Sequence, residues 1–311
     1  MTPFTHVSIV KKVIEVPGEL AASQERSNGA AGRAFVAELP RRAREFAERW
    51  GLRIDGPAMY GVCALVLPVV RAGGPPGLEE FGGGSRAVLK LQPVDEETVG
   101  EPLALRVWDG EGAVRLLEHD EPTGTLLLER LDASRTLSGV PDSREAVRVI
   151  GALLARLTAV PAPPGLRTLN SLTRAMLDRV PRVLERVPDP EDRRLLRDCA
   201  AAVREVASEP GDRLLHWDLH YGNVLAAGRA DWLAIDPKPL AGDPGFELLP
   251  ALRNRYDPAE TRWRFDALTD ALDLDRERAW AWTLGRVLQN SLWEAAEGRP
   301  LTAVAVARDL M

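Results

Sequence analysis

The chain has 311 residues, of which 45% are hydrophobic and 28% charged, and its formal net charge is −6. This composition is typical of a soluble globular protein, and the length suffices for two lobes with separate cores. The longest nearly apolar run, residues 62–70, is too short to cross a membrane, and no aromatic-basic cluster indicates nucleic-acid binding. We therefore expect neither a membrane nor a nucleic acid as partner.

The two cysteines lie far apart in the sequence, and the first residues lack the pattern of a secretion signal. Both features favour a reduced, cytoplasmic setting. We expect a monomer there.

The first third of the chain predicts a helix followed by strands. Apolar residues recur every three or four positions over 31–50, which is the helical period. The weakly patterned residues 7–16 before it could form a strand or an extended arm. Strands are predicted at 62–70 and 86–92, on either side of a turn at 71–85 that is rich in Gly and Pro.

The second of these strands carries Lys90 near its end. A predicted helix over 95–108 follows, with Glu97 and Glu101 one turn apart, and then a hairpin over 114–130. This order is that of the N-terminal lobe of a kinase, where the lysine holds the α- and β-phosphates of ATP and the helix glutamate pairs with the lysine. We favour Glu101 for the pair, with Glu97 second. Surface positions for all three residues are the alternative.

The turn that would cover the nucleotide carries no G-x-G-x-x-G motif. The candidate is the segment 55–63, which has only Gly56 and Gly61. The run of three glycines at 82–84 directly precedes the lysine strand, so it predicts a hairpin turn and not a phosphate-binding loop. A Walker A loop is also missing from the sequence.

Residues 129–132 are expected to link two lobes, and backbone groups near Glu129 and Leu131 would bind the adenine. We therefore expect an α+β fold with a small antiparallel sheet and one key helix in an N-terminal nucleotide-binding lobe. This lobe would cover residues 1–131 and would begin with a leading helix. The remaining residues, 132–311, would form a helical C-terminal lobe with the catalytic loop and the substrate pocket.

Helical periodicity dominates the second half of the chain, and proline clusters separate the segments. Helices are predicted at 145–158, 172–186, 191–207, 261–272, 275–297 and 303–310.

The most informative stretch of the chain is His216-x-Asp218-x4-Asn223, followed by an apolar strand that ends at Asp236. The segments 223–225 and 232–235 predict a hairpin, which would bring Asn223 and Asp236 together. Phosphoryl transfer requires positioning and charge neutralisation. Asp218 fits the base that orients an acceptor hydroxyl, and Asn223 and Asp236 supply the hard oxygen ligands that Mg²⁺ prefers. His216 is expected to brace the loop.

These residues resemble the aminoglycoside phosphotransferase family, and the resemblance is closest to its streptomycin 6-phosphotransferase and hydroxyurea phosphotransferase subgroup. It implies a protein-kinase-like fold with two lobes, ATP and Mg²⁺ as cofactors, and a cationic aminoglycoside as the small-molecule substrate. One departure is Glu247, which stands where an aspartate is expected. The segments that carry the resemblance are 127–137, 160–167, 209–227, 232–248 and 288–294.

The last quarter of the chain, residues 231–311, holds 14 acidic and 10 basic residues. Such an excess could form a pocket for a polycation, and we expect Glu247, Asp270 and Glu294 to contact the substrate. The alternative is that these acids pair with arginines on helix surfaces. The arginines considered for this are Arg253, Arg255 and Arg286.

Three functions are compatible with these features. The first is transfer of the γ-phosphoryl of ATP to a hydroxyl of an aminoglycoside, with the 6-hydroxyl of streptomycin favoured, which would inactivate the antibiotic. The second is a kinase of another small alcohol, such as hydroxyurea or a sugar. The third is a non-catalytic nucleotide-binding module.

Overall fold

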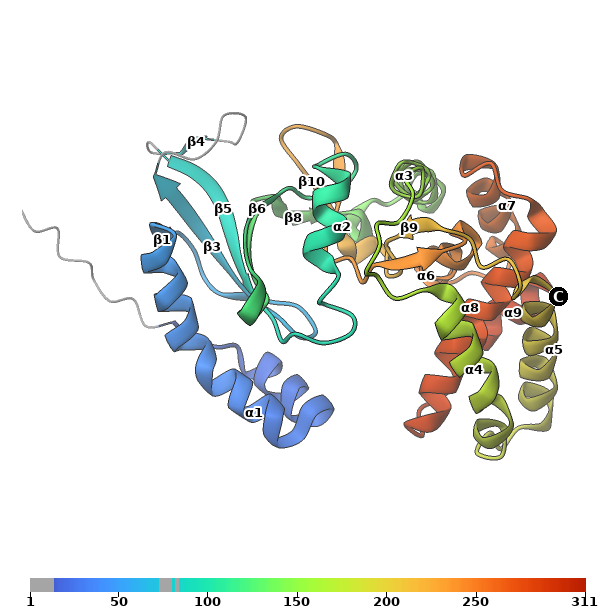
Figure 1. Cartoon of the computed structure of the whole chain (residues 1–311). Helices are drawn as coiled ribbons and strands as arrows, with labels where there is room; N and C mark the ends of the chain where they lie inside the picture. The colour runs from blue at the N-terminus through green and yellow to red at the C-terminus, as the bar shows by residue number, and fades with distance from the viewer. Residues whose placement is uncertain (1–13, 73–79, 82–83) are drawn as a thin grey trace, which may run out of the picture. The chain divides into compact units, whose positions relative to one another are not determined.

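A computed structural model describes residues 14–72, 80–81 and 84–311 of the chain (Figure 1). Contacts divide the chain into two compact units: 1–93 with 117–130, and 94–116 with 131–311. The expected arm at 7–16 lies mostly outside the described residues, as does most of the Gly- and Pro-rich turn. Within the described part of the chain, no helix is long and apolar enough to cross a membrane.

The first unit contains a seven-stranded sheet in the order β1-β3-β5-β7-β6, with β2 paired to β3 and β4 paired to β5. Its centre is the antiparallel pair β3 and β5, which runs from Leu65↔Leu91 to Ala72↔Gly84. The strands are β1 (Leu52–Ile54), β2 (Met59–Tyr60), β3 (Leu65–Ala72), β4 (Glu80–Phe81), β5 (Gly84–Leu91), β6 (Leu116–Asp120) and β7 (Thr125–Glu129).

Helix α1 (Gly18–Arg49) packs against this sheet, beside β1 and β3 in Figure 1. Its helical period places Leu39, Ala43 and Phe46 in one core with alternate residues of β3 and β5. The helix is longer than the predicted 31–50, and its helical backbone is interrupted at Gly29, whose φ is 55°. A glycine adopts this conformation without the steric penalty of a side chain, so the chain can turn there.

Helix α2 (Glu101–Trp108) begins later than the predicted residue 95. The Asp95 carboxylate accepts hydrogen bonds from the backbone N–H groups of Glu97 and Thr98, each at 2.9 Å, and so closes a separate turn. Glu97 therefore lies in this turn, and the expected helical face that it would share with Glu101 does not form.

Residues 94–116 pack within the second unit, although the expected boundary assigned them to the first lobe. Trp108 Nε1 donates to the Leu157 carbonyl at 2.9 Å, and Ala234 N donates to the Gly112 carbonyl at 2.9 Å. These bonds join α2 and the loop after it to residues far along the chain. The functional division at residues 131 and 132 stays a prediction.

The second unit is mainly helical, and its longest helix is α8 (Arg276–Ala296). Helices α5 and α8 approach closely at Gly285, where an added Cβ would lie 2.7 Å from Val203 Cγ2. The sheet of the first unit and the helices of the second confirm the mixed α+β architecture. The helices predicted from residue 145 onward begin and end within a few residues of their predicted bounds. The other helices are α3 (Ser143–Leu157), α4 (Leu169–Leu184), α5 (Pro190–Val206), α6 (Leu248–Arg253), α7 (Thr261–Ala271) and α9 (Val304–Leu310).

The burial of Phe46 leads to a stability prediction for the first unit. Phe46→Ala should lower the free energy of unfolding of this unit by about 3–5 kcal/mol, because a large side chain leaves a cavity in a packed core. Phe35→Ala is the matched control, since Phe35 lies on the same helix and is only partly buried. Hydrogen exchange of the backbone amides of β3 and β5 measures both changes. Equal losses for the two variants would contradict this view of the core.

Candidate active site

Two nested strand pairs bring the two loops of the candidate site together. Strands β9 (Arg213–Leu215) and β12 (Leu240–Gly242) form the outer pair. Strands β10 (Val224–Ala226) and β11 (Trp232–Ala234) form the inner hairpin, close to the predicted bounds. The loop 216–223 and the loop 235–239 each connect the outer pair to the inner one, so they must lie next to each other.

His216 joins the two loops. Its Nδ1 accepts from the Asp218 backbone N–H at 3.3 Å, so the neutral ring carries its proton on Nε2 and donates to the Ile235 carbonyl at 3.0 Å. The ring is fully buried and stacks on Trp108 with 6.2 Å between centroids. Burial lowers the pKa of His216 to about 3, which keeps the ring neutral at physiological pH. This geometry supports a bracing role and not proton transfer.

Two buried ionisable side chains form hydrogen bonds with the backbone N–H and the backbone carbonyl of Trp217. Its N–H donates to Glu247 Oε1 at 2.6 Å, and its carbonyl accepts from Arg286 Nη2 at 3.0 Å. Trp217 has a φ of 72°, a conformation that is costly for a bulky side chain and needs such support. Burial raises the pKa of Glu247 to about 7, against the effect of the hydrogen bond from Trp217. Glu247 therefore acts on the loop that carries Asp218.

Asp218 presents its carboxylate from this braced loop, with 38% of the side chain exposed. Partial burial raises the pKa of Asp218 above its ordinary value, while the charges of His220 and Arg286 oppose that rise. His220 Nε2 lies 3.9 Å from Asp218 Oδ2. A raised pKa makes the ionised carboxylate a better proton acceptor, which suits a general base.

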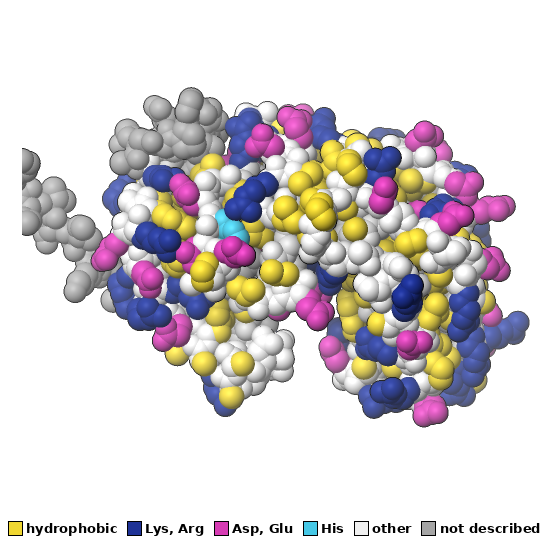
Figure 2. Space-filling model, in the orientation of Figure 1, with side chains coloured by type: hydrophobic (Ala, Val, Ile, Leu, Met, Phe, Trp, Pro, Cys, Tyr) yellow, Lys and Arg dark blue, Asp and Glu magenta, His cyan; other side chains and the backbone are white. Residues whose placement is uncertain are grey.

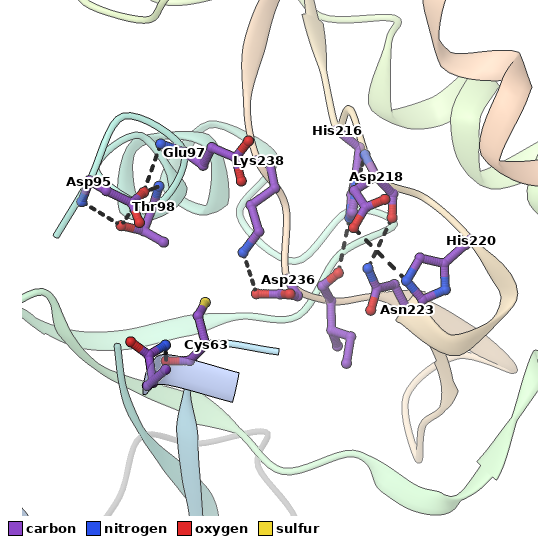
Figure 3. A network of polar contacts seen from close by, with 12 residues as sticks. Cys63, Asp95, Glu97, Thr98, His216, Asp218, His220, Asn223, Asp236 and Lys238 are labelled. Atoms are coloured by element: carbon purple, nitrogen blue, oxygen red, sulfur yellow. Dashed lines mark hydrogen bonds and ion pairs between the residues drawn. The ribbon is translucent and has the colours of Figure 1, made fainter. Parts of the chain in front are cut away.

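Asn223 and Asp236 supply the oxygen atoms that could hold a metal ion. Asn223 Nδ2 donates to the Asp218 carbonyl at 2.9 Å, so the hydrogen bond fixes which branch of the amide is the oxygen (Figure 3). The backbone carbonyl of Asn223 also accepts a hydrogen bond from the Ile235 backbone N–H at 2.9 Å. This bond joins the residues that flank the two ends of the hairpin. An amide oxygen and a carboxylate fit Mg²⁺, which takes few protein ligands and keeps several waters.

Lys238 is a residue of this region whose role the sequence pattern does not indicate. Its Nζ lies 3.0 Å from Asp236 Oδ1, and Figure 3 shows the two side chains pointing toward one another. Its backbone N–H donates to the His216 carbonyl at 2.9 Å. The scarcity of lysine in this arginine-rich chain was a signal that its chemistry is needed, but only the fold places it beside Asp236.

The residues expected to contact the nucleotide from the first unit lie on the sheet and one of its turns. Lys90 is buried on β5 and paired between Val66 and Leu126 of the neighbouring strands. Gly61 donates its N–H to the Ala64 carbonyl at 3.0 Å and so closes the turn between β2 and β3. Glu129 is buried at the end of β7, two residues before Leu131. Their roles toward a nucleotide stay predictions.

Glu101 is fully buried at the first position of α2. Glu97 is about half exposed, and its Oε1 lies 4.0 Å from Arg167 Nη1. Lys90 and Glu101 belong to different compact units. The proposed pairing of Glu101 with Lys90 stays a prediction.

The three carboxylates expected to contact a substrate all have protein partners. Glu247 is buried at the end of the 3₁₀ turn η4 (Pro244–Glu247), and Glu294 accepts from the Thr302 N–H at 2.9 Å and lies 3.6 Å from Arg253. Asp270 is exposed and 3.4 Å from Arg276. Figure 2 likewise shows acidic and basic side chains interspersed on the face in view. Of the arginine pairs considered as the alternative, Glu294 with Arg253 is present, whereas Asp270 pairs with Arg276 and buried Glu247 accepts from a backbone N–H. Substrate contact stays a prediction.

Comparison with known proteins gives the family. The family model for the aminoglycoside/hydroxyurea antibiotic resistance kinases matches residues 49–298. A hydroxyurea phosphotransferase from Kitasatospora aureofaciens is 61% identical over 97% of this chain and 87% of its own length. A streptomycin 6-kinase from Streptomyces glaucescens is 53% identical over 92% of this chain and 93% of its own length.

A solved structure shows the same fold at low sequence identity. It is an aminoglycoside phosphotransferase in a ternary complex with AMP-PNP and hygromycin B. The TM-score is 0.59 at 16% identity, over 86% of this chain and 95% of that chain. The fold is therefore protein-kinase-like, as the sequence predicted. Together with the match over residues 49–298, these findings show that the chain belongs to the aminoglycoside/hydroxyurea antibiotic resistance kinase family.

Proposed function

We propose that this kinase moves the γ-phosphoryl of ATP to the 6-hydroxyl of streptomycin and so inactivates the antibiotic. The observation that carries the proposal is the convergence of Asp218, Asn223 and Asp236 on two hydrogen-bonded loops. The streptomycin 6-kinase from Streptomyces glaucescens, 53% identical over nearly the whole chain, supports the choice of acceptor. The AMP-PNP in the solved neighbour supports the choice of ATP.

The proposed mechanism assigns one task to each part of the site. Asp218 accepts a hydrogen bond from the acceptor hydroxyl, orients its oxygen toward the γ-phosphorus and takes its proton as the new oxygen–phosphorus bond forms. The bond between the γ-phosphorus and the β-phosphate oxygen breaks in the same transfer, and ADP leaves. Asn223 and Asp236 would hold Mg²⁺, which would neutralise charge on the phosphates. His216, Glu247 and Arg286 keep the Asp218 loop in place, so that little reorganisation is needed at the moment of transfer.

Hydroxyurea is the second candidate acceptor, and two observations favour it. The relative that is a hydroxyurea phosphotransferase is 61% identical to this chain. In addition, Glu247 and Glu294 are buried with protein partners, which leaves exposed Asp270 as the one of the three expected carboxylates that a polycation could reach directly. A small neutral acceptor would not need those anionic contacts.

A direct assay of products separates the two candidates. The protein is incubated with Mg·ATP and, separately, with streptomycin, other aminoglycosides, hydroxyurea and sugars, and the mixtures are measured by mass spectrometry. We expect a gain of one phosphate on streptomycin. Phosphate on hydroxyurea alone would make the second candidate correct, and no phosphorylated acceptor at all would contradict both.

Asp218 can be tested as the base. Asp218→Ala should lower kcat on the order of 10²-fold or more, because a positioned acid–base group is lost, while nucleotide affinity changes little. Asp231→Ala is the matched control, since Asp231 is exposed in the turn of the β10–β11 hairpin and loses the same charge. A folded Asp218→Ala variant that keeps more than half its kcat would show that Asp218 is not the base.

Asp236 can be tested as the metal ligand. Asp236→Asn should abolish the Mg²⁺ dependence of nucleotide binding, because an amide replaces the anionic oxygen that holds the ion. Calorimetric titrations of ATP with and without Mg²⁺ measure this for the wild type, Asp236→Asn and the control Asp231→Asn. If Asp236→Asn binds Mg·ATP as tightly as the wild type does, with the same Mg²⁺ requirement, the assignment fails.

A further inference from the structure

Lys238 is a buried lysine in a chain that otherwise uses arginine almost throughout. The chain has 40 basic residues, and lysines occur only at positions 11, 12, 90 and 238. Lys238 is 8% exposed. Removing an ammonium group from water is costly unless a partner compensates it, so lysines are rarely buried without a structural or chemical reason.

The backbone of Lys238 is fixed on both sides. Pro237 and Pro239 flank it, each with a fixed φ, and the following proline disfavours the helical region for Lys238. The Lys238 N–H donates to the His216 carbonyl at 2.9 Å, and its own carbonyl accepts from Arg167 Nη2 at 3.0 Å. The side chain therefore starts from a rigid point that is attached directly to the catalytic loop.

The ammonium group is directed at the expected metal ligand. Nζ lies 3.0 Å from Asp236 Oδ1, and Asp236 itself has a φ of 57°, a conformation that is uncommon for aspartate. Backbone strain of this kind is found where the surrounding structure fixes a functional side chain. Because that carboxylate would hold the phosphates through the metal, we expect a cation in contact with it to lie near the phosphates.

We propose that Lys238 is a further phosphate-binding residue of this kinase, which holds the Asp236 carboxylate before the nucleotide binds and then contacts the terminal phosphoryl group. This inference rests on the proposed phosphotransferase function. A lysine suits the task because its ammonium is a compact point charge on a flexible stem, so it can turn from a carboxylate to a phosphate without moving the backbone. Its charge would stabilise the terminal phosphoryl as the bond to ADP breaks.

A purely structural role for Lys238 makes the opposite prediction. If the ammonium serves only as counter-ion to Asp236, it competes with Mg²⁺ for the carboxylate. Its removal would then change the affinities for ATP and ADP equally, and it would lower the Mg²⁺ concentration that nucleotide binding needs. If the ammonium contacts the terminal phosphoryl, its removal weakens the binding of ATP more than the binding of ADP, because ADP lacks that group.

The test compares AMP-PNP with ADP by calorimetry at saturating Mg²⁺. Lys238→Met should raise the Kd for AMP-PNP about tenfold or more, as expected for one charge-assisted hydrogen bond, while the Kd for ADP changes much less. Arg299→Met is the control, because Arg299 is exposed and loses the same charge. Equal changes for the two nucleotides, or no change for AMP-PNP, would overturn the proposal.

Two further measurements guard against misfolding and against failure of the proposed function. Lys238→Gln keeps a hydrogen-bond donor near Asp236 without the charge, so it should fold and still show the selective loss for AMP-PNP, and thermal melting monitors the fold of each variant. A wild type that binds both nucleotides but phosphorylates no acceptor would contradict the proposed function alone, and the nucleotide comparison would still decide the role of Lys238. A wild type that binds neither nucleotide would overturn both.

Discussion

The candidate site depends on the hydrogen bonds that join two loops distant in sequence. His216 donates to the Ile235 carbonyl, and the His216 carbonyl accepts from the Lys238 N–H. The ring can do this because it is buried and neutral, with a pKa lowered to about 3. A charged imidazolium would have no acceptor for the Asp218 N–H and would pay the full cost of burial. The side chain and the backbone carbonyl of His216 therefore both join the loops that carry Asp218 and Asp236.

Buried ionisable side chains hold the backbone near Asp218 and Asp236 in place. Glu247 accepts a hydrogen bond from the Trp217 backbone N–H, and Arg286 donates one to the Trp217 backbone carbonyl. The Arg286 guanidinium also lies 4.1 Å from the centre of the Trp217 ring. Arg167 lies 4.5 Å from the same ring and also binds the carbonyl of Lys238. Both arginines thus connect the residue before Asp218 to its surroundings. The unfavourable backbone conformation of Trp217 is retained because these contacts hold it.

Much of this site could be predicted from the sequence, because its elements are local. The spacing from His216 to Asn223 and the short hairpin before Asp236 are consecutive, so turn chemistry and strand length suffice to bring them together. The predicted start of α2 was wrong because an aspartate at 95 can cap a turn as well as a helix, and the sequence alone did not separate the two.

Features that depend on tertiary contacts could not be predicted in this way. Glu247 was expected to face a substrate, yet its burial under Trp217 follows from how η4 packs against α8. The place of Lys238 depends on a pairing of β9 with β12 that closes a loop of more than twenty residues. Charge counts over the last quarter of the chain likewise could not decide between substrate contact for Glu294 and its observed pairing with Arg253, which had been considered as the alternative.

The most direct test of the proposed site is the position of the metal in crystals grown with AMP-PNP and Mn²⁺ in place of Mg²⁺. Anomalous scattering locates the Mn²⁺ independently of the protein coordinates. We predict a peak within coordination distance of both the Asn223 amide oxygen and the Asp236 carboxylate, with Asp218 left uncoordinated beside the acceptor site. A metal held by other residues, with Asn223 and Asp236 away from the phosphates, would contradict this arrangement.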